Sequence, residues 1–183
     1  QALSLLTNTL GAGATLTSTG GDDGHGAQHA VVYTDFARPL EATVTDGNGH
    51  PVAGVPITFT APTTGSGGTF PGNHTSETVY TDSTGLATSQ TFTANGTVGA
   101  YDVTITAAGF TGQALSSLTN TLGAGATITT TSGGANGTSA IVNTAFTAPL
   151  EATVRDNNGH PVGGVPVTFA APTTGASGTL PGG

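Results

Sequence analysis

The chain repeats itself at an interval of about 110 residues, and this repetition restricts the possible folds more than any other feature. Residues 40–59 return as residues 150–169, and about 25 of the 33 positions in 40–72 are identical to their counterparts in 150–182. A repeat of this length is too long for the stacked units of a solenoid and has the size of one β-sandwich domain. We therefore expect tandem domains.

The self-alignment divides the 183 residues into three predicted parts. Residues 11–122 form one complete domain, called the first copy, and residues 123–183 form the N-terminal part of another, called the second copy. Residues 1–10 match 113–122 and are expected to be the closing strand of a preceding domain. We expect the chain to be a window of a longer array. The alternative is a subunit that completes its neighbour by strand donation, but one donated strand cannot replace the roughly three strands that the second copy lacks.

Residues 40–59 have the pattern of a strand, a turn and a second strand. Apolar side chains alternate with polar ones on both sides of the turn, at Leu40, Ala42, Val44, Val55, Ile57 and Phe59. This period of two is typical of half-buried strands. The turn, Asp-Gly-Asn-Gly at 46–49, supplies residues that accept a positive φ and bond their own backbone, so the chain can reverse there.

Similar segments recur through the first copy at spacings of roughly eight to twelve residues. About seven strands are predicted, at residues 14–18, 40–45, 55–60, 78–81, 86–93, 101–107 and 113–122, with weaker segments at 31–33 and 69–70. In the last strand Leu115 and Leu118 are three positions apart, which predicts a β-bulge. No stretch has the period of a helix. The chain is therefore predicted to be an all-β antiparallel sandwich.

The charge balance excludes several classes of partner. The chain has ten acidic residues, two arginines (Arg38 and Arg155), no lysine and a formal net charge of −8. Nucleic acid and anionic lipid are bound through clustered Lys and Arg, so neither is an expected partner. No apolar run approaches the ~18 residues of a membrane-spanning segment. The absence of cysteine removes disulfides, thiolate metal sites and cysteine nucleophiles,.

Four motifs of the first copy resemble a known family. They are Leu-Glu-Ala-Thr-Val-Thr-Asp at 40–46, Gly-His-Pro-Val-Ala-Gly-Val-Pro-Ile-Thr-Phe at 49–59, Thr-Asp-Ser-Thr-Gly-Leu-Ala at 81–87 and Gly-Ala-Tyr-Asp-Val-Thr at 99–104. In this order they resemble the bacterial Ig-like domains of the invasin and intimin group, over nearly the whole first copy.

The resemblance implies an Ig-like Greek-key β-sandwich that serves as a rigid spacer in adhesins or filaments, without a catalytic residue to carry over. It also implies that strands 40–45 and 55–60 lie in opposite sheets, with the turn between them crossing from one sheet to the other. His50 and His160 depart from the family, which more usually has Asn or a similar polar residue before this proline.

The segment 21–26, with His29 nearby, is a polar cluster that could hold a cation. Asp22 and Asp23 offer carboxylates suited to calcium, and His25 with His29 offers imidazoles suited to a transition metal. Adjacent carboxylates cannot both point inward without a special turn, and the second copy keeps neither Asp nor His here. We therefore predict a solvated loop and no metal site.

The turns at 46–50 and 156–160 recur in both copies. They carry oxygen-bearing side chains, at Asp46, Asn48, Asp156, Asn157 and Asn158. These could bind calcium at a domain junction. The alternative, which we favour, is that they stabilise the chain reversal through Asx-type hydrogen bonds, with His50 and His160 capping the turns. No cofactor is predicted.

Glu41 and Asp102 could suggest a pair of catalytic carboxylates. Each falls on the outward face of a different predicted strand. No Ser-His-Asp series has a supporting elbow motif, and no Gly-rich loop precedes a helix to hold a phosphate. We predict no enzymatic activity and no catalytic, cofactor-binding or metal-binding residue.

Three N-x-[ST] acceptor sequences lie in predicted loops, at Asn73, Asn95 and Asn136,. So short a pattern arises often by chance in a Thr-rich chain. Glycosylation, of these residues or of outward-facing threonines, is therefore the weaker alternative to an unmodified chain.

These observations predict a structural spacer or stalk module of an extracellular adhesin or filament at the bacterial cell surface. Its partners would be neighbouring Ig-like repeats of the same or identical chains, joined through short junctions at 11–14 and 123–126 that limit interdomain swing. Two alternatives stay open. The loops at 20–30 or 61–68 could contact a receptor or glycan on a host or cell surface, or the chain could be a fibre subunit that polymerises by strand exchange.

Overall fold

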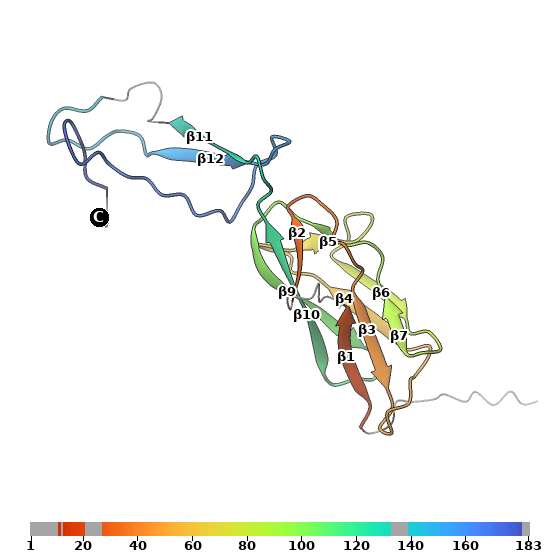
Figure 1. Cartoon of the computed structure of the whole chain (residues 1–183). Coiled ribbons are helices and arrows are strands. Elements are labelled where there is room, and N and C mark those ends of the chain that lie inside the picture. Colours follow the sequence, from red (N-terminus) through yellow and green to blue (C-terminus); the bar gives the residue numbers. More distant parts are fainter. Residues whose placement is uncertain (1–10, 12, 21–26, 133–138, 181–183) are drawn as a thin grey trace, which may run out of the picture.

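The described part of this computed structural model, residues 11, 13–20, 27–132 and 139–180, contains twelve β-strands and no helix. In chain order the strands are β1 (Thr15–Gly20), β2 (Gln28–Val31), β3 (Glu41–Thr45), β4 (Pro56–Thr60), β5 (Gly68–Thr69), β6 (Ser76–Tyr80), β7 (Leu86–Thr88), β8 (Thr93–Ala94), β9 (Gly99–Ala107), β10 (Gln113–Thr121), β11 (Thr127–Ser132) and β12 (Glu151–Arg155). The predicted all-β class is confirmed (Figure 1).

Two larger sheets form the body of the first copy (Figure 1). One has three strands in the order β1-β3-β7, and the other has five in the order β2-β10-β9-β4-β6. β2 and β10 run parallel, and the other pairs within these two sheets are antiparallel. β5 and β8 form a small separate pair. β3 and β4 lie in different sheets, so the turn between them crosses from one sheet to the other, as the resemblance implied.

The hydrophobic core lies between these two sheets. Fully buried apolar side chains come from both, namely Ala42, Val44 and Ala87 from the three-stranded sheet and Ile57, Phe59, Val103, Ile105 and Leu118 from the five-stranded one. Those on the same strand are two positions apart, because alternate side chains of a strand point to opposite faces of the sheet. The arrangement is consistent with a β-sandwich.

The weak strand predicted at 31–33 is placed wrongly. β2 ends at Val31, and the chain then enters a turn. Tyr33 has a φ of 63°, which no extended strand allows,. The Thr34 backbone N–H donates to the Val31 carbonyl at 3.0 Å and closes this turn.

The single strand predicted at 86–93 is two short strands, β7 and β8. β7 ends at Thr88, and Ser89 then bonds twice to Leu40. The Ser89 N–H donates to the Leu40 carbonyl and the Ser89 Oγ accepts the Leu40 N–H, both at 2.9 Å. The chain leaves the three-stranded sheet at this point, and Phe92 enters the core.

The bulge predicted in the closing strand is wrong. β10 pairs with β9 in unbroken register from Gln113 to Asn120. Leu115 points outward and is 48% exposed, whereas Ser116 and Leu118 are buried. The alternation is therefore regular, and an inward position of the strand is filled by a serine.

The described residues of the second copy form one strand pair, which matches a pair of the first copy. β11 and β12 pair in the same register as β1 and β3, and the register shifts at equivalent places, between Thr130 and Ser132 and between Ser18 and Gly20. Residues 165–180 contain no strand. Large apolar side chains exposed in the described part of the second copy are Ile128, Ile141, Val142, Phe146, Leu150, Phe169 and Leu180. Figure 1 shows the second copy extending from one end of the first.

Candidate interface between the two copies

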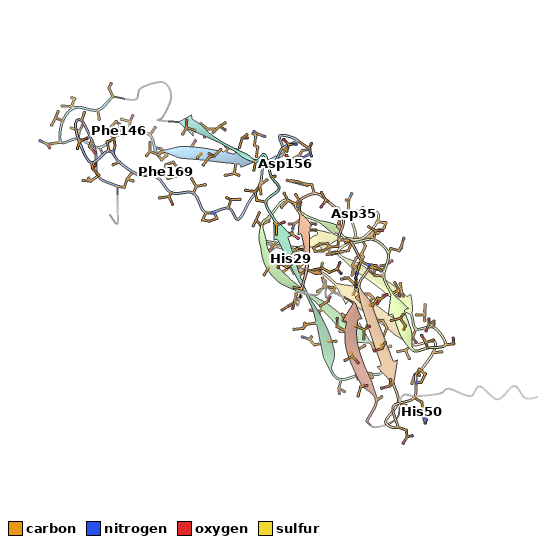
Figure 2. All side chains as sticks on the ribbon, in the orientation of Figure 1. His29, Asp35, His50, Phe146, Asp156 and Phe169 are labelled. Carbon is orange, nitrogen blue, oxygen red and sulfur yellow. The ribbon has the colours of Figure 1, made fainter. Side chains whose placement is uncertain are left out.

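A turn of the second copy lies against the first copy. Residues 156–164 follow β12 and are called the second-copy turn, and their counterparts, residues 46–54, follow β3 and are called the first-copy turn. Figure 2 shows Asp156 of the second-copy turn beside the end of the first copy. His50 of the first-copy turn lies at the opposite end of the first copy. The two equivalent turns thus occupy the two ends of one repeat.

Backbone hydrogen bonds join the second-copy turn to a loop of the first copy. The Gly163 N–H donates to the Gly96 carbonyl at 2.9 Å, and the Val98 N–H donates to the Gly163 carbonyl at 3.0 Å. Together they make a parallel β-bridge between Thr97 and Gly163. Beside it, a Cβ on Gly164 would collide with the Val98 carbonyl oxygen. The contact is therefore a close main-chain contact that depends on glycine.

Tyr33 adds a side-chain contact to this bridge. Its Oη donates to the Pro161 carbonyl at 2.8 Å, and its ring lies 5.0 Å from the His160 ring. Its left-handed φ costs a bulky residue about 1 kcal/mol. The counterpart is Asn143, with a φ of 65°, and Asn adopts this region more readily,. Gly96 leaves room for Tyr33, because a Cβ there would overlap the tyrosine hydroxyl. Tyr33 thus holds a strained conformation where it touches the second copy.

Asn120 holds the loop of the bridge in place, and sequence reasoning missed it. The side chain is fully buried on β10. Its Nδ2 donates to the Gly67 carbonyl at 2.8 Å and lies 3.1 Å from both Asn95 Oδ1 and the Thr97 carbonyl. Its Oδ1 accepts a hydrogen bond from Tyr101 Oη at 3.1 Å. Burial raises the pKa of the Tyr101 hydroxyl, so it stays protonated as a donor,. A polar residue at an inward position of a strand was the available signal.

The two turns have the same internal hydrogen bonds. Asp46 Oδ1 accepts the backbone N–H groups of Asn48 and His50, both at 2.8 Å, and Asp46 Oδ2 lies 3.2 Å from His50 Nδ1. The second-copy turn repeats these contacts around Asp156, at 2.9, 2.8 and 3.1 Å. The predicted Asx-type bonds are confirmed. Each carboxylate is directed at nitrogen groups of its own turn, which is the arrangement of a turn-stabilising residue.

These hydrogen bonds lower the pKa of both turn carboxylates. For Asp46 the largest cause is the backbone hydrogen bond from His50,. For Asp156 the largest single effect is burial, which raises the pKa, but the hydrogen bonds within its turn together outweigh it, and the pKa lies below the ordinary 3.8. The exposed fraction of the side chain is 36% for Asp46 and 7% for Asp156. The carboxylate is buried in the turn that contacts the neighbouring copy.

A third turn of this kind connects β6 to β7. Asp82 Oδ1 accepts hydrogen bonds from Thr84 Oγ1 at 2.7 Å, from the Thr84 N–H at 2.8 Å and from the Leu86 N–H at 3.1 Å. The Thr84 hydroxyl is the largest cause of the lowered pKa of Asp82. Asp82 thus stabilises the turn at 82–85 in the same way as Asp46 and Asp156 stabilise their turns.

The cation cluster considered from the sequence lies mostly outside the described residues. Asp22, Asp23 and His25 belong to the part that is not described, and His29 lies on β2 with an exposed side chain. Within the described ranges, no three His, Asp or Glu side chains lie close enough together to hold a metal ion. The solvated loop stays a prediction.

Glu41 and Asp102 are not brought together. Glu41 lies on β3 of the three-stranded sheet and Asp102 on β9 of the five-stranded sheet. Asp102 instead accepts a hydrogen bond from Ser117 Oγ at 2.6 Å on the surface. The geometry gives a carboxylate pair no support.

Two of the N-x-[ST] sequences differ in the state of the acceptor amide. Asn73 is exposed in a turn, with a φ of 62°. Asn95 Nδ2 donates to the Gly65 carbonyl at 2.9 Å, and its Oδ1 accepts the Thr97 N–H at 3.0 Å. A glycan on Asn95 would disturb the loop that contacts the second copy. Asn136 lies outside the described residues.

In the described part of the chain there is no helix with the length and apolar character needed to cross a membrane. Comparison of the chain with protein-family models, with curated proteins and with solved structures gave no match in any of the three.

Proposed function

We propose that this chain is a structural spacer or stalk module of an extracellular bacterial adhesin or filament, built from tandem Ig-like Greek-key sandwiches. The strand orders β1-β3-β7 and β2-β10-β9-β4-β6 support the Ig-like part, because β3 and β4 lie in opposite sheets while β4, β9 and β10 share one,. The four motifs that resemble the invasin and intimin group support a place at the bacterial surface.

The contact between the two copies is the observation that carries this proposal. Five residues, 122–126, connect β10 to β11. The second-copy turn then bonds back to the first copy through Gly163, Gly96, Val98 and Tyr33. A second contact beside the covalent connection restricts the swing of one domain against the next. A stalk needs such a restriction to stay extended.

The outer faces of the sheets also suit a stalk. Cross-strand threonine pairs take the place of charged pairs there, with Thr15 Oγ1 2.7 Å from Thr45 Oγ1 and Thr58 Oγ1 2.8 Å from Thr78 Oγ1. Such pairs stabilise neighbouring strands. With little charge to desolvate, these faces could also associate side by side in a filament.

The relative orientation of the two copies tests the proposal. Residual dipolar couplings of the full chain should fit one alignment tensor for the first copy and the β11–β12 pair together. Gly164→Ala should separate them into two tensors, because its Cβ collides with Val98. Gly54→Ala is the matched control, since Gly54 has the same φ of 75° but nothing within 4 Å of an added Cβ. Both changes carry the same backbone strain, about 1 kcal/mol.

Two independent tensors in the unmodified chain would contradict a fixed junction. Electron microscopy of the native material provides a second measurement. Rods with an axial period of one repeat are expected, and isolated globular particles would contradict an array.

A further inference from the structure

The first-copy turn is preformed in the shape that makes the contact in the second copy. Equivalent glycines have equal φ values, 84° at Gly49 and Gly159 and 75° at Gly54 and Gly164. The backbone bond from Asp to the His carbonyl that closes each turn measures 2.8 Å in the first copy and 2.9 Å in the second. A partner that docks on the first-copy turn would therefore order little additional chain.

The two turns differ in what is seated on them. The Gly163 N–H is bonded across the junction, whereas the Ala53 N–H at the same position donates to no backbone acceptor in the described residues. A Cβ on Gly164 would strike the first copy, whereas a Cβ on Gly54 would meet nothing within 4 Å. One turn is occupied by a repeat, and its duplicate at the other end presents the same backbone edge with no backbone partner among the described residues.

The residues that precede the first copy have the sequence of the end of another repeat. Residues 1–10 are identical to residues 113–122 at nine of ten positions. The linker Gly-Ala-Gly-Ala is the same at 11–14 and at 123–126. A repeat that closes at residue 10 would therefore be joined to the first copy by the connection that joins the first copy to the second.

We propose that the first-copy turn is a docking surface for a second copy of the same repeat, which presents the backbone of its loop 96–98. This proposal rests on the proposed spacer function and states how each junction is made. The Ala53 N–H donates to the carbonyl of Gly96 of the docked repeat, and the Val98 N–H of the docked repeat donates to the Ala53 carbonyl. Recognition is thus a short β-bridge between main chains.

The side chain of Ala53 fits this interface. Its counterpart is Gly163, and a Cβ added there lies 3.3 Å from Thr97 Oγ1 and 3.7 Å from Thr97 Cγ2. A shift of a few tenths of an ångström in the threonine side chain relieves this contact. At the next position both copies keep the glycine that the close approach to Val98 requires.

The test uses the complete chain with one repeat added in front of it. Residues 11–112 are placed before Gln1, so that residues 1–10 become the closing strand of the added repeat. Amide hydrogen exchange is then compared by NMR between the extended and the original chain. Exchange at Ala53 should slow by at least about tenfold, because its N–H gains a backbone bond away from water. Gly163 should be equally protected in both chains.

Unchanged exchange at Ala53 beside a protected Gly163 overturns the docking proposal and leaves the spacer function standing. An unprotected Gly163 in both chains overturns both. The Val103 amide, in the middle of β9, serves as the check that the repeats are folded in every sample.

Val98→Pro, placed in one repeat at a time, supplies the matched variants. In the added repeat it removes the donor to the Ala53 carbonyl, so Ala53 exchange should return to its value in the original chain while Gly163 stays protected. In the original repeat it should release Gly163 and leave Ala53 protected. If Ala53 stays protected in the first variant, the loop 96–98 is not the docking partner and the proposal is overturned.

Discussion

Residues 55–59 and 165–169 read Val-Pro-Ile-Thr-Phe and Val-Pro-Val-Thr-Phe, and they have different structures. The first includes most of β4, which is paired on one edge with β6 and on the other with β9. The second contains no strand. Phe59 is fully buried, whereas Phe169 is 38% exposed. An alternating sequence specifies which side chains share a face, but the strand itself forms only where a neighbouring strand bonds to its edge.

The turns of the two copies show the opposite behaviour. Around Asp46 and Asp156 the same hydrogen bonds form, because donor and acceptor are never more than four residues apart. Such local structure needs no partner strand. The two turns differ in burial and not in hydrogen bonding, as Val162 is 8% exposed and its counterpart Val52 is only half-buried.

The largest difference in stability is expected between two single variants, Phe59→Ala and Phe169→Ala. Phe59→Ala leaves a cavity between the two sheets and should lower the free energy of unfolding by about 3–5 kcal/mol. Phe169→Ala removes a partly exposed side chain outside any strand and should change it by less than about 0.5 kcal/mol. Urea unfolding followed by circular dichroism measures both. Equal losses would show that the two segments pack alike in solution.

Asn120→Ala should cause the second-largest loss of stability, because it leaves the Tyr101 hydroxyl and the Gly67 carbonyl without their partner. The expected loss in the free energy of unfolding is about 2 kcal/mol. Hydrogen exchange at Val98 should also become faster, since the loop of the interface loses its support. Asn48→Ala, an exposed Asn of the first-copy turn, is the control and should cost less than about 0.5 kcal/mol. A loss at Asn120 no larger than this control would contradict its role.

The smallest effect is expected from acid. The pKa values of Asp46, Asp82 and Asp156 are lowered below 3.8 in the folded chain. Their contribution to stability is therefore complete above pH 3.8 and is lost as the pH falls through the lowered folded values. Carbon-13 shifts of the three carboxyl groups should titrate with midpoints below 3.8. Asp46→Asn should flatten the decline of stability in acid, and a midpoint at or above 3.8 for Asp46 would contradict its turn bonding.

Local pattern predicted much of the first copy. The alternation in β3, β4 and β9 identified strands whose inward side chains make the core, and the Asp, Asn and Gly residues identified the turns at 46–50 and 156–160. These features depend on residues within a few positions of each other, so the sequence displays them directly. The predicted strand at 31–33 was wrong, because the left-handed φ of Tyr33 cannot continue β2. The predicted bulge was also wrong, because Ser116 occupies the inward position and its neighbour Leu115 points outward.

By itself, then, the sequence determined the all-β class, the repetition of about 110 residues and the bonding inside each turn. Tertiary structure alone decided that the buried Asn120 side chain donates to the Gly67 carbonyl. It also decided that Tyr33 bonds to Pro161, 128 positions away in the sequence, and that Gly163 bonds to Gly96 and Val98. The physical reason is that these contacts join groups from different strands and different copies. A main-chain bridge between two glycine-containing loops requires only free backbone groups and the absence of side chains, which a sequence does not display as a pattern.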